Sequence, residues 1–237
     1  METNISKTPQ AVAEAFANHF IALAKANKTL SVALSGGSTP KILFDLLAEL
    51  HATAIDWSGI HLYWGDERCV APTDSDSNYK MTLDHLLSKI DFPAQNVHRV
   101  LGENDPAGEA INYGNQIETN LPAANGLPQF DLIILGMGGD GHTASIFPHE
   151  IELLNSHHTC EVATHPESGQ KRITLTGKVI NNAKEICFLV TGAGKTEKID
   201  EIFHQTGDWK AYPASYIEPA DGKLTWFMDE AAAEKLV

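Results

Sequence analysis

Residues 130–145 read FDLIILGMGGDGHTAS, a nearly continuous apolar run that passes directly into a glycine-rich turn. A short apolar run without polar alternation is typical of a strand covered on both faces, as in the parallel sheets of α/β proteins. Polar side chains follow at the carboxyl end of this strand, which is where ligands bind in such sheets. The stretch therefore predicts both a class of fold and the place of a site.

The rest of the chain alternates between strand and helix signals in the same way. Residues 8–26 carry apolar side chains at helical spacing, with Thr8 as N-cap and Pro9 as the first helical residue. Strands that alternate with helices indicate an α/β fold with a mainly parallel sheet. Further strands are predicted at 29–35, 60–64, 172–176, 185–192 and 224–228, and helices at 41–50, 77–90, 195–205 and after residue 228.

Composition narrows the functional classes. The 237 residues are 43% hydrophobic and 20% charged, which indicates a globular protein, and the net charge is −14. An acidic chain binds nucleic acids poorly, because their phosphate backbones are bound by basic protein surfaces. No apolar run approaches the ~20 residues of a membrane span, and the first residues lack the pattern of a secretory signal. We expect a chain without nucleic-acid or membrane partners, located in the cytoplasm.

The three cysteines, Cys69, Cys160 and Cys187, are odd in number and form no CxxC pair. A disulfide framework and a zinc ribbon are therefore disfavoured, and a reducing compartment fits better. The HHTC segment at 157–160 contains metal-ligating residue types but lacks a companion set of ligands. No metal site is predicted.

The predicted strand at 29–35 ends in the loop SGGSTP, residues 35–40. Gly36 and Gly37 let the backbone approach a ligand closely, and the N-terminus of the following helix offers free N–H groups to a phosphate. The alternative is a plain turn in which the hydroxyl of Ser38 or Thr39 caps the helix.

The predicted strand at 60–64 ends in GDERCV, residues 65–70, which places Asp66 and Arg68 directly behind it. An arginine in this position suits the two-pronged binding of a phosphate or carboxylate. The alternative is a solvated surface turn. Both residues are candidate substrate contacts.

The glycines of GMGGDG satisfy the pattern GxGxxG, but the features of a dinucleotide site are missing. That site needs a helix running on from the third glycine and an acidic residue at the end of the next strand, whereas Pro148 interrupts here. Asp140 and His142 are better candidates for chemistry. Histidine titrates near neutrality and is the usual general base, and a carboxylate nearby can set its tautomer. The alternative is a histidine that only hydrogen-bonds the turn.

The loop TGAGKTEK at 191–198 resembles the end of a P-loop, but Leu189 stands where that motif requires glycine. Lys195 at a helix start can still bind a phosphate as a point charge. Arg172, at the beginning of a predicted strand, is a further candidate cation. Either side chain could equally be a surface charge.

Taken together, several segments resemble the 6-phosphogluconolactonase family in content and order, from near residue 31 to the C-terminus. They are SGGSTPKILFDLL (35–47), WGDERCVAPTDSDSNYKM (64–81), FDLIILGMGGDGHTASIFP (130–148), KRITLT (171–176), VTGAGKTEK (190–198), YPASYIEP (212–219) and LTWFMDEAAAEKL (224–236).

The resemblance implies one Rossmann-like α/β domain over residues 1–237, similar to glucosamine-6-phosphate deaminase, with neither metal nor nucleotide. It implies hydrolysis of 6-phospho-D-glucono-1,5-lactone, with His142 as general base, Arg68, Arg172 and Lys195 as cationic contacts, and the backbone of 36–39 joining them. Two other functions stay open: an amino-sugar-phosphate deaminase, which would need a carboxylate after the histidine loop, and a sugar-phosphate sensor that binds without turnover.

Overall fold

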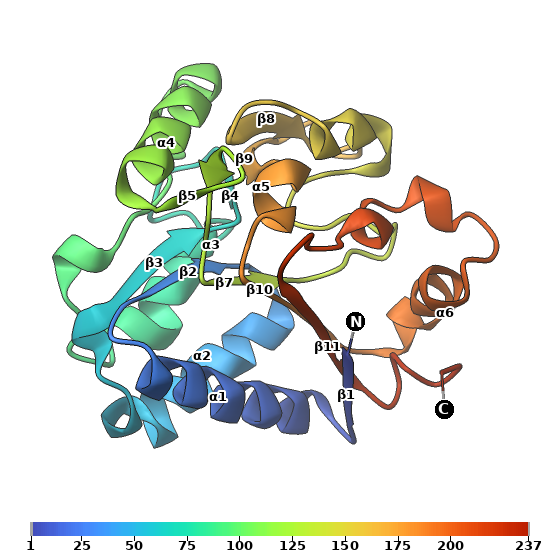
Figure 1. The fold of residues 1–237 in the computed structure, drawn as a ribbon, viewed down its shortest axis with the longest axis horizontal. Coiled ribbons are helices and arrows are strands. Elements are labelled where there is room, and N and C mark those ends of the chain that lie inside the picture. The colour runs from blue at the N-terminus through green and yellow to red at the C-terminus, as the bar shows by residue number, and fades with distance from the viewer. Residues whose placement is uncertain (1, 237) are drawn as a thin grey trace.

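A computed structural model describes residues 2–236, and its centre is a six-stranded sheet in which all neighbouring strands are parallel (Figure 1). The three strands in the middle of the sheet are buried along their whole length, as their apolar sequences predict. The predicted mainly parallel α/β fold is confirmed. In spatial order the strands are β1 (Glu2–Ser6), β11 (Lys223–Asp229), β10 (Glu185–Val190), β7 (Leu132–Leu135), β2 (Leu30–Leu34) and β3 (Ile60–Trp64).

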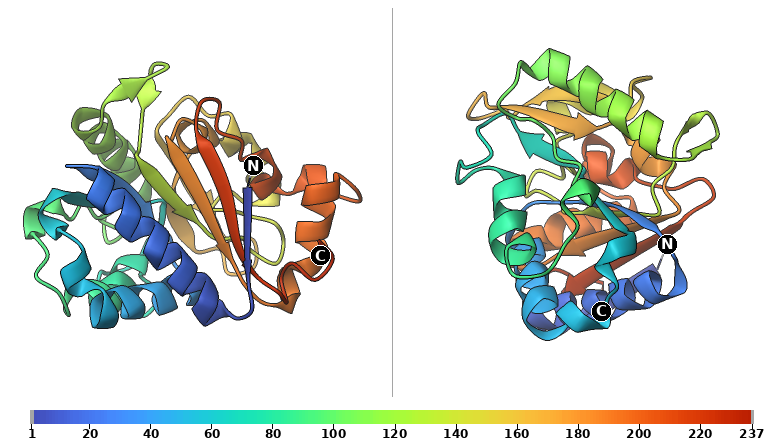
Figure 2. Two further views of the ribbon diagram at one scale, coloured as in Figure 1. Left: turned by 60° about the horizontal axis from the view of Figure 1, so that its bottom comes forward. Right: turned by 90° about the vertical axis from the view of Figure 1, so that its left-hand side faces the viewer.

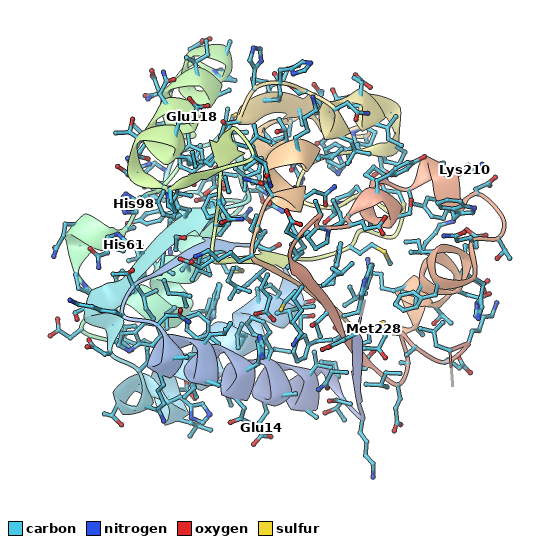
Figure 3. The ribbon with its side chains drawn as sticks, viewed as in Figure 1. Glu14, His61, His98, Glu118, Lys210 and Met228 are labelled. Atoms are coloured by element: carbon cyan, nitrogen blue, oxygen red, sulfur yellow. The ribbon has the colours of Figure 1, made fainter. Side chains whose placement is uncertain are left out.

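Helices cover both faces of this sheet. Phe16 of α1 packs edge-on against Phe227, whereas Phe203 of α6 packs against Trp226. Consecutive residues of a strand point to opposite faces, so α1 and α6 lie on opposite sides of β11. Figure 2 shows α1 lying along the sheet, and Figure 3 shows Glu14 of α1 pointing outward. One face carries α1 (Pro9–Ala26) and α2 (Ser38–Leu50), which pack together, and the other face carries α6 (Thr196–His204).

The start of α1 is as predicted, because Thr8 Oγ1 accepts a hydrogen bond from the Ala11 N–H at 3.2 Å and Pro9 is the first helical residue. The predicted helix at 77–90 is shorter and consists of α3 (Asn78–Thr82) continued by a π-helical turn (Leu83–Leu87). Within residues 2–236, no helix combines the length and apolar character needed to cross a membrane.

A second, antiparallel sheet stands above the carboxyl ends of the main one. The strand predicted at 172–176 exists, but it belongs to this second sheet rather than to the parallel one. Its helical cover packs on β8 and β9 and was not predicted. The strands of this sheet are, in spatial order, β4 (Asp66–Arg68), β9 (Lys171–Leu175) and β8 (Cys160–Thr164). The helix that covers it is α4 (Pro106–Asn120). This side also contains α5 (Gly177–Asn181) and a small hairpin formed by β5 (Ala123–Ala124) and β6 (Leu127–Pro128).

The helix predicted after residue 228 is wrong, because residues 230–236 form turns. The segment starts with a helix-like bond from the Ala233 N–H to the Asp229 carbonyl. The Asp229 carboxylate, however, accepts from the Ala232 N–H and also from the Gly192 N–H of a different loop. So short a segment gains too few bonds to offset helix nucleation.

Candidate active site

The carboxyl ends of β2, β3 and β7 meet β9 at a cavity between the two sheets. Six of the ten predicted site residues line it: Gly36, Gly37, Asp66, Arg68, His142 and Arg172. Four predicted residues do not line it: Ser38, Thr39, Asp140 and Lys195. The remaining lining residues are Ser35, Asn78, Gly136, Met137, Gly138 and Ala144.

The loop after β2 brings bare backbone to the cavity. Gly37 is the N-cap of α2 with φ +111°, a conformation that favours glycine, and no side chain caps the helix. The alternative reading of Ser38 or Thr39 as a cap is therefore wrong. Thr39 instead shares a hydrogen bond with Thr191, which ties this loop to the loop after β10. The uncapped N-terminus of a 13-residue helix suits an anion.

Arg68 and Arg172 are directly opposite each other in the antiparallel pair β4–β9. Like charges in this position repel and destabilise the pair. Burial lowers the pKa of Arg172, as does the charge of Arg68, while Asp66 acts in the opposite direction. The Nε atoms of both arginines are buried and, within residues 2–236, have no hydrogen-bond partner. Two converging guanidinium groups with free donors form a site for a di-anionic group.

Arg68 and Asp66 do not lie in a solvated turn, so that alternative is wrong. Asp66 is buried, and its carboxylate accepts hydrogen bonds from Ser145 Oγ at 2.6 Å and from Asn78 Nδ2 at 3.4 Å. Arg172 Nη1 also donates to Ser145 Oγ, at 3.4 Å. Through its hydrogen bonds, Asp66 thus holds Ser145 and Asn78 in place beside the arginines.

Glu67, the residue between them, points away from the cavity and is 2% exposed. Its carboxylate accepts hydrogen bonds from the backbone N–H groups of Arg68, Asn78 and Tyr79, each at 2.7 Å, and from Ser77 Oγ at 3.1 Å. Burial raises the pKa of Glu67 and the backbone bonds offset only part of the rise. This carboxylate clamps the start of α3, and with it Asn78, onto β4.

His142 and Asp140 form a hydrogen-bonded pair in the loop after β7. His142 Nδ1 and Asp140 Oδ1 are 2.6 Å apart, and the backbone N–H of His142 donates to the same oxygen at 3.2 Å. Burial alone would raise the pKa of Asp140, but the bonds and charge of His142 lower it to about 2. Asp140 is therefore ionised at neutral pH and accepts a hydrogen bond from Nδ1 of His142. The other ring nitrogen, Nε2, takes no part in this pair.

Two glycines in this loop are required by close contacts. A Cβ atom on Gly138 would lie 2.2 Å from His142 Nδ1 and 2.5 Å from Asp140 Oδ1. Gly141 has φ +83°, and a Cβ there would lie 2.5 Å from Tyr212 Cβ. The loop is thus glycine-rich because the His–Asp pair packs directly on its backbone. Residues 142–147 form no helix, and a 3₁₀ helix starts only at Pro148, which agrees with the rejection of a dinucleotide site.

Lys195 ends a 3₁₀ turn, Ala193–Lys195, between β10 and α6. Burial lowers its pKa, while the charge of Asp140 acts in the opposite direction, so the ammonium group lies on the Asp140 side of the site. Within residues 2–236, no carboxylate lies within ion-pair distance of it. Lys195 is a half-buried cation near Asp140, and it does not line the cavity with the two arginines.

Sequence reasoning missed Asn78 and Ser145. Both are nearly inaccessible to solvent and both bind Asp66. A signal for Ser145 existed, since it lies three residues after His142 in the same loop. Asn78 lies ten residues beyond Arg68, and its bonds to Glu67 and Asp66 bring it back to the cavity.

Comparison with known proteins identifies the family of the chain. The family model described as glucosamine-6-phosphate isomerases/6-phosphogluconolactonase matches residues 4–226. The 6-phosphogluconolactonase of Aggregatibacter actinomycetemcomitans is 42% identical over 230 residues, 97% of each chain. That of Treponema pallidum is 45% identical over 202 residues, 85% of this chain and 84% of its own.

Solved structures give the same result. The devB protein superposes with a TM-score of 0.95 at 44% identity, covering 100% of this chain and 99% of that one. The 6-phosphogluconolactonase of Trypanosoma brucei gives 0.90 at 30% identity, covering 100% and 98%. A monomeric glucosamine-6-phosphate deaminase gives 0.83 at 20% identity, covering 99% of each chain, which confirms the predicted similarity of fold. The chain therefore belongs to the glucosamine-6-phosphate isomerase/6-phosphogluconolactonase family.

Proposed function

We propose that this chain is an enzyme that hydrolyses 6-phospho-D-glucono-1,5-lactone to 6-phospho-D-gluconate, the second step of the oxidative pentose phosphate pathway. The observation that carries the proposal is one cavity lined by two opposed arginines and by a histidine that is paired with an aspartate. The family relatives named above are 6-phosphogluconolactonases, which supports the same substrate.

In this proposal the phosphate binds Arg68 and Arg172, with the backbone at the start of α2 beside them. Lys195 contacts the substrate from the loop after β10. The binding energy of the phosphate is used to fix the lactone ring, so that its C1 carbonyl lies at His142. Asp66 keeps the arginine end of the cavity in shape through Ser145.

His142 then acts as general base. Asp140 accepts the hydrogen bond at Nδ1, so Nε2 is free to take a proton from a water molecule. The water oxygen attacks C1 and forms a tetrahedral intermediate. When the intermediate collapses, the C1–ring oxygen bond breaks and His142 returns the proton to the leaving oxygen. No covalent enzyme intermediate is needed, since a lactone is already an activated ester.

The test is acid release from freshly made 6-phosphogluconolactone in a pH-stat, measured above the spontaneous rate. We expect rapid turnover of this lactone and much slower turnover of the unphosphorylated lactone. His142→Gln is expected to lower kcat by about 10²–10⁴, while 6-phosphogluconate still binds. The exposed His204, changed to Gln, is the matched control and is expected to have no effect.

Two results would contradict the proposal. Unchanged kcat in His142→Gln would remove the histidine from the mechanism. Release of ammonia from glucosamine 6-phosphate, with no lactone hydrolysis, would identify a deaminase instead.

A further inference from the structure

A second cluster of ligand-type side chains lies outside the catalytic cavity. It consists of His19 on α1 and of Glu185 and Cys187 on β10. His19 Nε2 is 2.8 Å from Glu185 Oε1, and Cys187 Sγ is 3.8 Å from the same oxygen. The three donor atoms all lie within 4.8 Å of one another. The proposed hydrolysis uses none of these residues.

The fold explains why the three side chains meet. Glu185 and Cys187 are two residues apart on one strand, so they point to the same face of the sheet. That face is the one covered by α1, which carries His19. Glu185 and Cys187 are buried, whereas the His19 side chain is 24% exposed and gives access from solvent.

One buried polar atom beside this cluster lacks a partner within residues 2–236. His19 Nε2 is paired with Glu185 Oε1 at 2.8 Å. Thr225 Oγ1, in contrast, is unpaired, and Thr225 is 6% exposed. It lies directly opposite Cys187 in the β10–β11 register, hence on the same face. Buried polar atoms are rarely left unsatisfied, so the Thr225 hydroxyl beside these three side chains indicates a missing ligand.

We propose that His19, Glu185 and Cys187 bind one divalent transition-metal ion of the Zn²⁺ type, with a water molecule in the fourth position beside Thr225. Imidazole, carboxylate and thiolate are ligands that Zn²⁺ combines in proteins. With Zn–N and Zn–O near 2.0 Å and Zn–S near 2.3 Å, tetrahedral donors are about 3.3–3.6 Å apart. The observed 2.8 and 3.8 Å separations reach this range with small side-chain rotations.

The charges also balance. On binding, the Cys187 thiol loses its proton to solvent, so one thiolate and one carboxylate neutralise a divalent ion. The nearby cation that opposes a metal is Lys223, whose charge acts on Glu185. Its ammonium group, however, pairs with Glu2 at 3.1 Å, which reduces its effect on the cluster.

The proposed role is structural. Glu185 is the first residue of β10, whereas the catalytic loop with Lys195 follows the last residue of that strand. The ion would therefore join α1 to the sheet at the amino end of β10, whereas the active site lies at the carboxyl ends of the strands. The proposal does not depend on the proposed lactone hydrolysis, because its test does not use activity.

The test is titration of the reduced, metal-free chain with Co²⁺, followed by absorption spectroscopy. We expect a sulfur-to-cobalt charge-transfer band in the near ultraviolet, with the visible bands of tetrahedral cobalt, saturating at one equivalent. Cys187→Ser and His19→Gln are expected to lose these bands. Cys160→Ser and Cys69→Ser are matched controls and are expected to retain them.

Zn²⁺ gives a second readout. It is expected to raise the unfolding temperature of the wild type by roughly 5–10 °C at about 100 times its dissociation constant, and to have no such effect on His19→Gln. The proposal is overturned if the wild type shows no thiolate band, if Cys187→Ser and His19→Gln keep it, or if Zn²⁺ stabilises His19→Gln as strongly as the wild type.

Discussion

Arg172 illustrates how a single side chain can mark a site. It is 9% exposed, yet within residues 2–236 its side chain has one hydrogen bond, the long one to Ser145, and its Nε is unpaired. A buried guanidinium normally has a carboxylate or several acceptors around it. The neighbour directly opposite is instead Arg68. The sequence identified both arginines as candidates, but their opposition depends on the β4–β9 register.

The first prediction concerns this arginine. Arg172→Met keeps most of the buried stem but removes the charge, so it is expected to raise KM by about 10–100-fold, the value of one charge-assisted hydrogen bond, with a smaller change in kcat. Steady-state kinetics on the phosphorylated lactone measure both constants. Lys171→Met, on the neighbouring exposed residue, is the control. Equal KM values for the two variants would show that Arg172 does not bind the phosphate.

The second prediction concerns the His142–Asp140 pair. Asp140→Asn is expected to lower kcat, because an amide holds the ring's tautomer less well than a carboxylate. Since the folded-state pKa of Asp140 is lowered to about 2, its contribution to stability is present above its ordinary value near 3.8 and is lost as the pH falls towards 2. Denaturant unfolding across this window is expected to be less pH-dependent in the variant. An identical pH dependence would contradict the pairing.

At the scale of elements, the structure adds mainly what the apolar pattern could not show. The buried strands of the parallel sheet and the helices α1, α2 and α6 were predicted, because a continuous apolar run or a clear apolar face marks each of them. The helix α4 was missed since its sequence, PAGEAINYGNQIETN, is largely polar and contains two glycines. The strand β4 is only three residues long and carries three charges, a composition that is common in loops.

Glu67 shows why such a charged strand exists. Its carboxylate has no basic partner within residues 2–236 and is buried at the junction of β4 and α3, where it receives four hydrogen bonds. It connects the two elements through their backbone N–H groups. No sequence pattern distinguishes this buried acid from the exposed acids of an ordinary turn.

The third prediction is for this junction. Glu67→Gln replaces one acceptor oxygen by a donor, which leaves a buried N–H or hydroxyl group unpaired, at a cost of about 1–3 kcal/mol in the free energy of unfolding. We expect KM to rise as well, since Arg68 and Asn78 shift, while kcat changes less. Denaturant unfolding and kinetics measure these effects. Glu49→Gln, at an exposed position, is the control, and equal behaviour of the two variants would show that the clamp is dispensable.

At the scale of the whole molecule, the site lies between the two sheets. The main sheet supplies Gly36, Gly37 and His142, and the antiparallel sheet supplies Arg68 and Arg172. The sequence indicated each strand-end loop separately. It could not show that a second sheet places the arginines across from the histidine, because this depends on long-range pairing.

The fourth prediction follows from the contribution of both sheets to the site. A ligand that contacts both sheets binds only the folded state and so stabilises it. We expect 6-phosphogluconate at about 100 times its dissociation constant to raise the unfolding temperature by roughly 5–10 °C. Gluconate without the phosphate is expected to have little effect, and Arg172→Met is expected to remove the shift. A full shift in that variant would place the phosphate elsewhere.

The facing arginines on β4 and β9 have a practical consequence for bench work. Inorganic sulfate and phosphate are compact dianions, so each can relieve the repulsion between the two guanidinium groups without bringing a sugar. In assays with phosphate buffer, the buffer anion is therefore expected to compete with the substrate, so the measured substrate affinity is too low. Crystals grown from ammonium sulfate are expected to carry a sulfate ion at this position. A zwitterionic buffer with chloride as counterion avoids both effects.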